Sequence, residues 1–342
     1  MMWKYLSRFL PLTALLLFLA GCGEQRMTAL DPMGPQSQWI FDNMILSLYV
    51  MALVIIVVFA LFFIAVVKFR KKPGDNEIPE QVEGSHKLEI TWTVIPILLL
   101  VVLAIPTLTG TFLLADTEPE EGDEDAVVID VTGHQYWWQF DYEEGFTASN
   151  DVYIPVGEKV TFNLHASDVI HSFWVPALGG KVDNLPGVEN ALWLEADEPG
   201  VYMGKCAELC GPSHALMDFK LIALERDDYD AWVESMQEDP EEELEETVAN
   251  QGREVFEDQG CIGCHAIGGS GSAAGPTLTN FGDRETIANY LEMNEENLEA
   301  WIREPQALKQ GNNMPEYPDM PQEEMDALVD YLMELSVMDE EE

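Results

Sequence analysis

Basic residues are scarce in this chain. It has 17 lysines and arginines against 62 aspartates and glutamates in 342 residues, a formal net charge of −45. Residues 1–114 hold eight residues of each sign, so residues 115–342 carry nine basic and 54 acidic ones. Such a surface repels a phosphate backbone, which excludes nucleic acid as a partner. It predicts instead a solvated acidic surface suited to high salt or an alkaline exterior, or a docking field for a basic redox partner.

Cysteine is scarce as well, with five residues in the whole chain. Cys22 ends an apolar leader, Cys206 and Cys210 share one short loop, and Cys261 and Cys264 lie in C-I-G-C-H. Each of these positions has a chemical task, so no cysteine is left for a structural disulfide. That excludes the disulfide scaffold common in small exported domains.

Charge is absent from two long stretches, residues 44–67 and residues 90–115. Each is longer than the roughly 20 residues needed to cross the hydrocarbon core of a membrane. Basic residues gather between them, at positions 68–72 and at Lys87. The positive-inside rule therefore places this loop in the cytoplasm and both ends of a two-helix hairpin outside.

The N-terminus reads as an export signal. Lys4 and Arg8 precede an apolar run over residues 9–20 and then Leu-Ala-Gly-Cys. This order is typical of a secretory signal peptide over residues 1–22, and the small residues before Cys22 resemble a lipoprotein cleavage box. Cleavage would leave Cys22 as a lipidated N-terminus, whereas the alternative is an uncleaved leader. Residues 23–115 then form an N-terminal segment and the hairpin.

The acidic part of the chain begins with an all-β pattern. Residues 126–226 contain short β-rich runs separated by glycine, proline and asparagine, which indicates a sandwich or barrel. A glutamate-rich stretch with Pro240 follows at residues 227–247. Repulsion between its charges favours an extended acidic linker, apart from a helical turn or two in its first half.

One loop of the β region gathers metal-binding side chains. The stretch 202–217, YMGKCAELCGPSHALM, contains Cys206, Cys210, His214 and Met217, and His171 lies upstream in DVIHSFW. Thiolates, imidazoles and a thioether form a soft ligand set, which suits copper. Two cysteines this close can bridge a pair of metal ions, with one histidine on each side. Such a site favours electron transfer over substrate chemistry.

Two simpler interpretations of this loop remain open. Cys206 and Cys210 could instead form a disulfide, as paired cysteines outside the cytoplasm often do. Two cysteines and two histidines also match a structural zinc site. Met217 argues against zinc, because a thioether is a poor zinc ligand and a common weak ligand of copper.

The full spacing C-x-E-x-C-x3-H-x2-M resembles the binuclear copper A domain of cytochrome c oxidase subunit II. This resemblance implies a cupredoxin-like Greek-key barrel over residues 126–226. It implies the copper A ligands His171, Cys206, Glu208, Cys210, His214 and Met217. Glu208 would ligate copper through its backbone carbonyl, and its carboxylate would bind a magnesium ion shared with subunit I.

The resemblance also gives roles to residues outside this loop. Glu89 begins the second span in H-K-L-E-I-T-W. In the family, a glutamate at this place lies at the mouth of a proton channel. Taken without the resemblance, Glu89 is a surface carboxylate of the kind that stabilises a helix N-terminus. The cluster GHQYWWQF in the family carries a tryptophan that receives electrons. This chain has Tyr136 at that position, so Tyr136 and Trp137 are the electron-uptake candidates, and Trp138 is assigned to packing.

A second redox motif lies near the C-terminus. Cys261, Cys264 and His265 form a c-type haem attachment motif, in which both thiols bond the haem and the histidine is an axial ligand. Met314, before a proline, is the candidate sixth ligand, and Met320 is its rival for the same reason. With the downstream G-P-T-L, residues 248–338 resemble an all-α class I cytochrome c domain, and His/Met ligation raises the haem potential.

Together these features resemble subunit II of a bacterial aa3-type haem–copper oxidase with a fused cytochrome c (caa-type). The resemblance implies electron flow from a cytochrome c or bc-type complex to haem c, then to copper A and subunit I, where oxygen becomes water with proton translocation. It implies subunits I and III as partners, and a multi-pass protein of the bacterial cell membrane with both redox domains outside.

Two other functions are compatible with parts of this pattern. They are a free-standing membrane-anchored copper and haem electron carrier, and the copper A subunit of a nitric or nitrous oxide reductase. Glu89, the two-span hairpin and the fused cytochrome favour the oxidase. A quinol oxidase subunit is disfavoured because that branch lacks the copper ligands.

Overall fold

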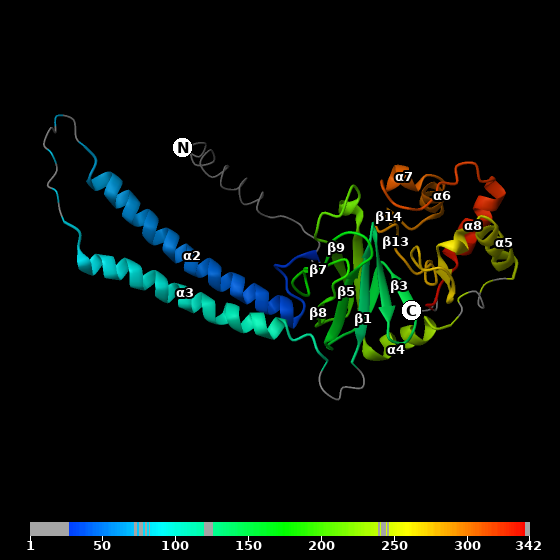
Figure 1. The fold of residues 1–342 in the computed structure, drawn as a ribbon, viewed down its shortest axis with the longest axis horizontal. Helices are drawn as coiled ribbons and strands as arrows, with labels where there is room; N and C mark the ends of the chain where they lie inside the picture. The colour runs from blue at the N-terminus through cyan, green and yellow to red at the C-terminus, as the bar shows by residue number, and fades with distance from the viewer. Residues whose placement is uncertain are drawn as a thin grey trace, which may run out of the picture.

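The chain is arranged as three successive parts. The structure is a computed structural model that describes residues 27–71, 83–119, 126–238 and 246–338, with the single positions 74, 78, 81, 240 and 244. Cys22 and the predicted signal peptide lie outside the described residues. Two long helices project from one end of a β-sheet body, and a smaller helical body covers its other end (Figure 1).

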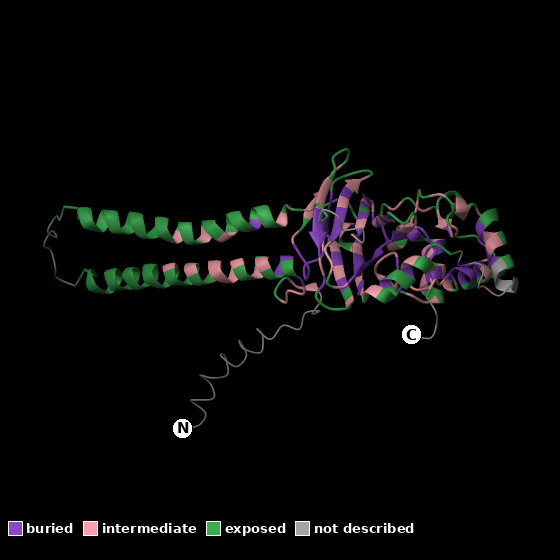
Figure 2. Ribbon diagram, turned by 90° about the horizontal axis from the view of Figure 1, so that it is seen from below, coloured by how far each residue is buried: buried purple, intermediate pink, exposed green. Residues whose placement is uncertain are grey.

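The projecting helices are α2 (Pro35–Lys68) and α3 (His86–Leu114). Within the described residues these two are long and apolar enough to cross a membrane. Their side chains are exposed along most of both helices (Figure 2). An exposed apolar surface of this size is unstable in water and requires lipid or partner helices around it.

The first turn of α2 is anchored in the β body. The Gln36 side chain donates to the Trp193 carbonyl at 2.8 Å and accepts from the Gly180 N–H at 2.9 Å. Gln36 is buried, so both ends of its amide are satisfied by backbone groups of the β body. The membrane hairpin therefore holds the β body close to the membrane surface.

The β body is a sandwich of two five-stranded sheets, in the orders β3-β2-β1-β5-β8 and β4-β10-β9-β6-β7. The strands are β1 (Val128–His134), β2 (Trp137–Tyr142), β3 (Thr147–Ser149), β4 (Asp151–Pro155), β5 (Val160–Ala166), β6 (His171–Trp174), β7 (Val182–Asn184), β8 (Asn190–Leu194), β9 (Gly200–Cys206) and β10 (Asp218–Leu224). Two neighbouring pairs are parallel, β1 with β5 and β10 with β4, and the others are antiparallel. The predicted cupredoxin-like β domain is confirmed.

The core of the sandwich is aromatic. Every second residue of β2 is buried, as expected for a strand with one face on the core. Phe173 of β6 stacks on Phe219 of β10, with 4.6 Å between ring centroids, and Trp138 of β2 packs against both rings. This rigid cluster lies directly beneath the loop that carries the predicted copper ligands.

The region predicted as an acidic linker, 227–247, with a helical turn or two in its first half, begins in the structure with a helix of ten residues. Helix α4 (Arg226–Ser235) packs on the sandwich and buries Tyr229 and Trp232. The Trp232 ring stacks on Tyr153 at 4.2 Å between centroids. The free energy of burying two large aromatic side chains outweighs the repulsion between neighbouring acidic groups. The sandwich therefore extends beyond its last strand.

The C-terminal body is mainly helical, as predicted. Its helices are α5 (Glu246–Asp258), α6 (Glu295–Arg303), α7 (Pro305–Leu308) and α8 (Gln322–Met333). Helices α5 and α8 cross closely at Gly252, where an added Cβ would lie 2.0 Å from Tyr331 Cβ. Two short strand pairs lie between the helices: β11 (Ala266–Ile267) with β12 (Ser270–Gly271), and β13 (Thr286–Ile287) with β14 (Leu291–Glu292).

Candidate copper and haem sites

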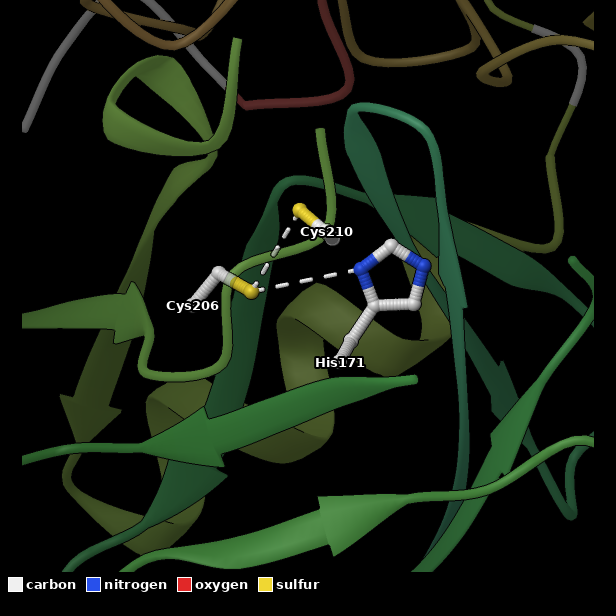
Figure 3. Close-up of side chains that lie close together, drawn as sticks. All are labelled: His171, Cys206 and Cys210. Atoms are coloured by element: carbon white, nitrogen blue, oxygen red, sulfur yellow. Dashed lines mark hydrogen bonds between the residues drawn. The ribbon is translucent and has the colours of Figure 1, made fainter. Parts of the chain in front are cut away.

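The soft side chains of the β body converge on one point. Cys206 Sγ lies 3.8 Å from Cys210 Sγ and 3.9 Å from His171 Nδ1. Figure 3 shows these three side chains pointing toward one another. Cys210 Sγ lies 3.7 Å from His214 Nδ1 and 3.8 Å from Met217 Sδ. One histidine therefore stands on each side of the sulfur pair.

Both cysteines of this cluster are free thiols. Their sulfur separation of 3.8 Å is far longer than the ~2.05 Å of a disulfide. The Glu208 carbonyl accepts from Cys206 Sγ at 3.3 Å, so the backbone of the predicted fifth ligand also faces the cluster. The buried thioether of Met217 completes a donor set that suits copper better than zinc.

The strands position these side chains from two directions. His171 is the first residue of β6, and Cys206 is the last residue of β9, which pairs antiparallel with β6. The remaining donors lie on the loop between β9 and β10, where His214 begins the short 3₁₀ helix η2 (His214–Leu216). The loop is thus held at both ends by adjacent strands, which restricts how far its side chains can move.

His171 is oriented by groups that the sequence prediction missed. Its Nε2 lies 2.8 Å from Asp168 Oδ1, which leaves Nδ1 facing Cys206. Burial alone would lower the pKa of His171, but the hydrogen bonds with Cys206 and Asp168 outweigh it and raise the pKa. Asp168 precedes His171 by three residues, and a carboxylate that close to a predicted ligand is the signal that could have found it.

Asp168 is itself held in place as an anion. Its carboxylate accepts from the backbone N–H groups of Gln135 at 2.7 Å and Val169 at 2.6 Å. Burial raises the pKa of Asp168, but the hydrogen bonds from His171 and these two amides outweigh it, so the pKa lies below its ordinary value. An ionised Asp168 therefore faces His171 at neutral pH.

The two thiols also affect each other. The hydrogen bond with Cys210 is the largest cause that lowers the pKa of Cys206, and the same contact raises the pKa of Cys210. One thiolate is thus stabilised by its neighbour in the absence of metal. Two cationic ions bound between the sulfurs would favour the thiolate form of both.

The three aromatic residues around the start of β2, Tyr136 to Trp138, differ in their surroundings. Trp138 is fully buried, and its indole N–H donates to the Met217 carbonyl at 3.4 Å, so it supports the metal loop. Tyr136 is also buried, and its ring lies beside the metal loop at Gly211. Trp137 stacks on His134 at 4.1 Å between centroids.

The helical body contains a cavity lined by the residues of the predicted haem motif. Cys261, Cys264, His265 and Met314 all line it. The cavity continues to the β body, because Tyr136 and Trp137 line the same space. Met320 is not among its lining residues and is buried in the core of the helical body.

The imidazole of His265 is prepared as a ligand. Its Nδ1 donates to the Pro276 carbonyl at 2.7 Å, since a carbonyl only accepts. Burial lowers the pKa of His265 more than this hydrogen bond raises it, so the ring is neutral at pH 7. The neutral ring therefore keeps the lone pair of Nε2 for an axial bond.

A buried cation lines the same cavity. Arg284 Nη2 donates to the Thr277 carbonyl at 2.7 Å and to Asn280 Oδ1 at 3.1 Å, while its Nε has no partner. A buried guanidinium with an unused donor fits an anionic ligand, and haem carries two carboxylates. The residues present therefore fit a haem in chemistry as well as in motif.

Glu89 lies far from both redox sites. It is in the first turn of α3, at the end of the hairpin farthest from the β body (Figure 1). Its Oε2 lies 3.3 Å from His86 Nδ1, and the side chain is half exposed. Within the described chain no other ionisable group is paired with it, so the proton-channel role remains a prediction.

Comparisons with known proteins match all three parts of the chain. Residues 27–109 match the transmembrane domain of "Cytochrome C oxidase subunit II", residues 144–224 match its periplasmic domain, and residues 249–336 match "Cytochrome c". These matches imply copper in the β body and haem c in the helical body.

Full-length relatives carry the same name. "Cytochrome c oxidase subunit 2" of Alkalihalophilus pseudofirmus is 70% identical over 341 residues, which is 99% of each chain. The protein of that name from Bacillus sp. (strain PS3) is 47% identical over 98% of each chain. "Quinol oxidase subunit 2" of Bacillus cereus is 37% identical over 69% of this chain and 81% of its own length.

The matches agree with the fold and with the donor set of the two sites. Relatives of this kind are subunits of a terminal haem–copper oxidase, so subunit I is an implied partner and the two apolar helices are membrane spans. The chain therefore belongs to the cytochrome c oxidase subunit II family, with a cytochrome c domain at its C-terminal end.

Proposed function

We propose that this chain relays electrons from a covalently bound haem c to a binuclear copper A centre and on to subunit I of an aa3-type oxidase. There oxygen is reduced to water, and protons are translocated. The proposal rests on one observation: the same chain holds a set of copper-binding side chains and a cavity lined by a haem motif. Two thiols, two imidazoles and a thioether converge in the β body, and a haem-motif cavity opens against the same β body.

The proposed copper ligands are His171, Cys206, Glu208, Cys210, His214 and Met217. When bound, the copper pair supplies one-electron chemistry with little reorganisation. Cys206 and Cys210 hold their sulfurs side by side as bridges, and the carboxylate of Asp168 keeps the Nδ1 of His171 toward them. Packing of the aromatic core beneath the loop limits movement of the ligands.

The proposed haem ligands are His265 and Met314, with thioether bonds from Cys261 and Cys264. Met314 is favoured over Met320 because only Met314 lines the cavity. The haem supplies the one-electron donor when bound. The Pro276 carbonyl fixes the tautomer of His265, and the Asn312 side chain accepts from the Met314 N–H at 2.8 Å, which fixes the backbone there.

The proposal extends to the membrane and to partners. The hairpin spans the bacterial cell membrane twice, with both redox domains outside and Cys22 lipidated after cleavage of the leader. Glu89 takes up protons at the cytoplasmic end of the hairpin, and the Glu208 carboxylate shares magnesium with subunit I. The other proposed partners are subunit III and, as electron donor, a cytochrome c or a bc-type complex. The basic loop and the placement of Glu89 at the end beside it support this orientation.

Replacing a bridging sulfur tests the proposal. In the Cys206→Ser complex, oxygen consumption should fall to a few per cent of wild type or less, because a hydroxyl is a hard ligand that does not bridge copper as a thiolate does. Haem c should still become reduced by the donor, while the haem of subunit I stays oxidised. Oxygen consumption at the wild-type rate would contradict the proposal.

A further inference from the structure

The helical body touches the metal loop directly. Ser213, which precedes the proposed copper ligand His214, donates through Oγ to the Gln310 carbonyl at 2.7 Å. The neighbouring Lys309 donates through Nζ to the Tyr136 carbonyl of the β body at 2.8 Å. Residues 309–311 therefore lie on the metal loop, three residues before Met314 in the haem cavity.

Lys309 is an unusual residue for such a contact. It is buried, with only 3% of its surface exposed, and its ammonium also donates to the Ala288 carbonyl at 2.9 Å within its own body. Burying an ammonium is costly unless carbonyls or anions receive its protons. One of its two carbonyl partners belongs to the other body, so full satisfaction of Lys309 requires the two bodies to be in contact.

Three more polar contacts join the same two bodies. The Thr277 N–H donates to Ser149 Oγ at 3.0 Å, the Asn289 amide donates to Asn150 Oδ1 at 3.1 Å, and Lys220 pairs with Glu285. Each contact joins the helical body to the β body, and Thr277 and Ser149 are buried. Polar contacts are therefore a substantial part of this interface, to which Val337 adds apolar packing against the core of the β body.

We infer that Ser213 and Lys309 are positioning residues that dock loop 309–314 of the helical body on the metal loop. They hold the haem cavity against the copper ligands, so that electrons cross within one chain. This inference rests on the proposed function for its redox consequence, whereas the docking itself depends only on the contacts above. The hydrogen bonds of Ser213 and Lys309 join the two bodies directly beside the metal loop, so losing either one weakens docking there.

The test compares Ser213→Ala and Lys309→Met with wild type in the purified oxidase complex. Hydrogen exchange, followed by mass spectrometry, measures protection of the Thr277 amide, whose partner Ser149 lies across the interface. Flash reduction of haem c by a photoexcited ruthenium complex measures the rate of haem-to-copper transfer. We expect exchange to rise and the transfer rate to fall about tenfold in each variant, the scale set by one hydrogen bond.

Lys159→Met is the matched control. Lys159 carries the same charge, donates to the Glu118 carbonyl and lies over the Trp193 ring, with no contact to the helical body among its described partners. It should leave exchange and transfer at wild-type values. Haem absorption and copper EPR should be unchanged in all three variants, which separates docking from damage to either site.

Wild-type exchange and transfer in both Ser213→Ala and Lys309→Met would overturn the inference. If the Lys309→Met complex does not assemble, the result for Ser213→Ala decides whether the inference holds. Ser213→Ala removes only one hydroxyl from the β body, so its complex should assemble. A wild-type complex without copper or covalent haem would refute the proposed function, and the exchange measurement on Thr277 would still decide the docking.

Discussion

His171 illustrates how single residues define the copper site. Its ring is buried between Cys206, which faces Nδ1, and Asp168, which faces Nε2. On the remaining side β1 passes close to the ring at Gly133, where an added Cβ would lie 2.8 Å from His171 Cδ2. Two residues outside the ligand motif, Asp168 and Gly133, therefore help to set the position of this imidazole.

Adding one methyl group at Gly133 should disturb the site. Gly133→Ala forces the ring of His171 to move, and overpacking of this kind costs about 1–3 kcal/mol. We expect a lower melting temperature and less than full copper content, measured by calorimetry and metal analysis of the complex. In the control Gly180→Ala, the new Cβ meets Ile40 at an ordinary 3.6 Å, so both quantities should stay at wild type. Full copper content and unchanged melting in Gly133→Ala would contradict this view.

The proposed copper ligands could be picked out of the sequence because all but His171 lie in one short motif, and the structure brings them together. Asp168, Gly133 and Lys309 were not predictable in the same way. Gly133 lies on β1 and meets the ring of His171 from another strand, so its role depends on how the strands pack rather than on sequence spacing. Asp168 lies three residues before His171, in the loop that precedes β6, but nothing in its spacing alone shows that its carboxylate faces the ring. Lys309 looks like an ordinary surface lysine until the two bodies are placed together.

At the scale of elements, α4 changes the limits of the β body. Its sequence is acidic, and the sequence predicted only a helical turn or two here, within an otherwise extended tether. The spacing of Tyr229 and Trp232 puts both rings on one face of a helix, where Trp232 packs on Tyr153 and Tyr142 and Tyr229 packs beside Trp232. The helix also needs a sheet face on which to pack. The position of that face depends on the tertiary structure and cannot be predicted from the local sequence pattern.

Removing the larger of the two rings tests the role of α4. Trp232→Ala leaves a cavity among four aromatic side chains and should destabilise the β body by about 3–5 kcal/mol. Denaturant unfolding of the full chain, followed by copper-site absorption, measures this loss. Asp228→Ala, on the same helix outside this cluster, should be neutral within about 0.5 kcal/mol. A neutral Trp232→Ala would mean that α4 is only a tether.

Lys309, in loop 309–314, should make the stability of the folded chain depend on pH. Burial lowers the pKa of Lys309 from 10.5 to about 7, although the charges of Asp218 and Cys210 oppose this shift. Between these two values Lys309 binds a proton in the unfolded chain that it does not bind in the folded, docked chain. The folded chain is therefore stabilised relative to the unfolded chain as pH rises from about 7 toward 10.

The comparison of wild type with Lys309→Met isolates this effect. The difference in unfolding free energy of the helical body between the two chains should grow in favour of wild type by about 1 kcal/mol per pH unit above pH 7. Denaturant midpoints followed by haem absorption at pH 7, 8 and 9 give this difference. A difference that is constant with pH would show that Lys309 does not change protonation on folding.

At the scale of the whole molecule, charge is divided along the chain. The membrane hairpin is balanced, whereas the two outer bodies carry the entire excess of negative charge. A net charge this far from zero keeps the protein soluble and destabilises its compact state through self-repulsion. The three-part order was predictable because composition changes sharply at each limit, but the docking of one outer body on the other was not.

Salt should therefore stabilise the outer part of the molecule. Raising ionic strength from about 0.01 to 1 M shortens the Debye length from about 30 to 3 Å. Repulsion between acidic groups is then screened, and the melting temperature of the complex should rise by about 5 °C in sodium chloride. A melting temperature that falls with salt would indicate that ion pairs, rather than repulsion, dominate.

Metal analysis combined with EPR spectroscopy of the purified oxidase complex is the most direct test of the electron relay. This chain should contribute two copper ions and one covalent haem c, with an EPR signal of one unpaired electron shared by both coppers. Zinc bound at Cys206 and Cys210, or a disulfide between them in the native complex, would contradict the relay.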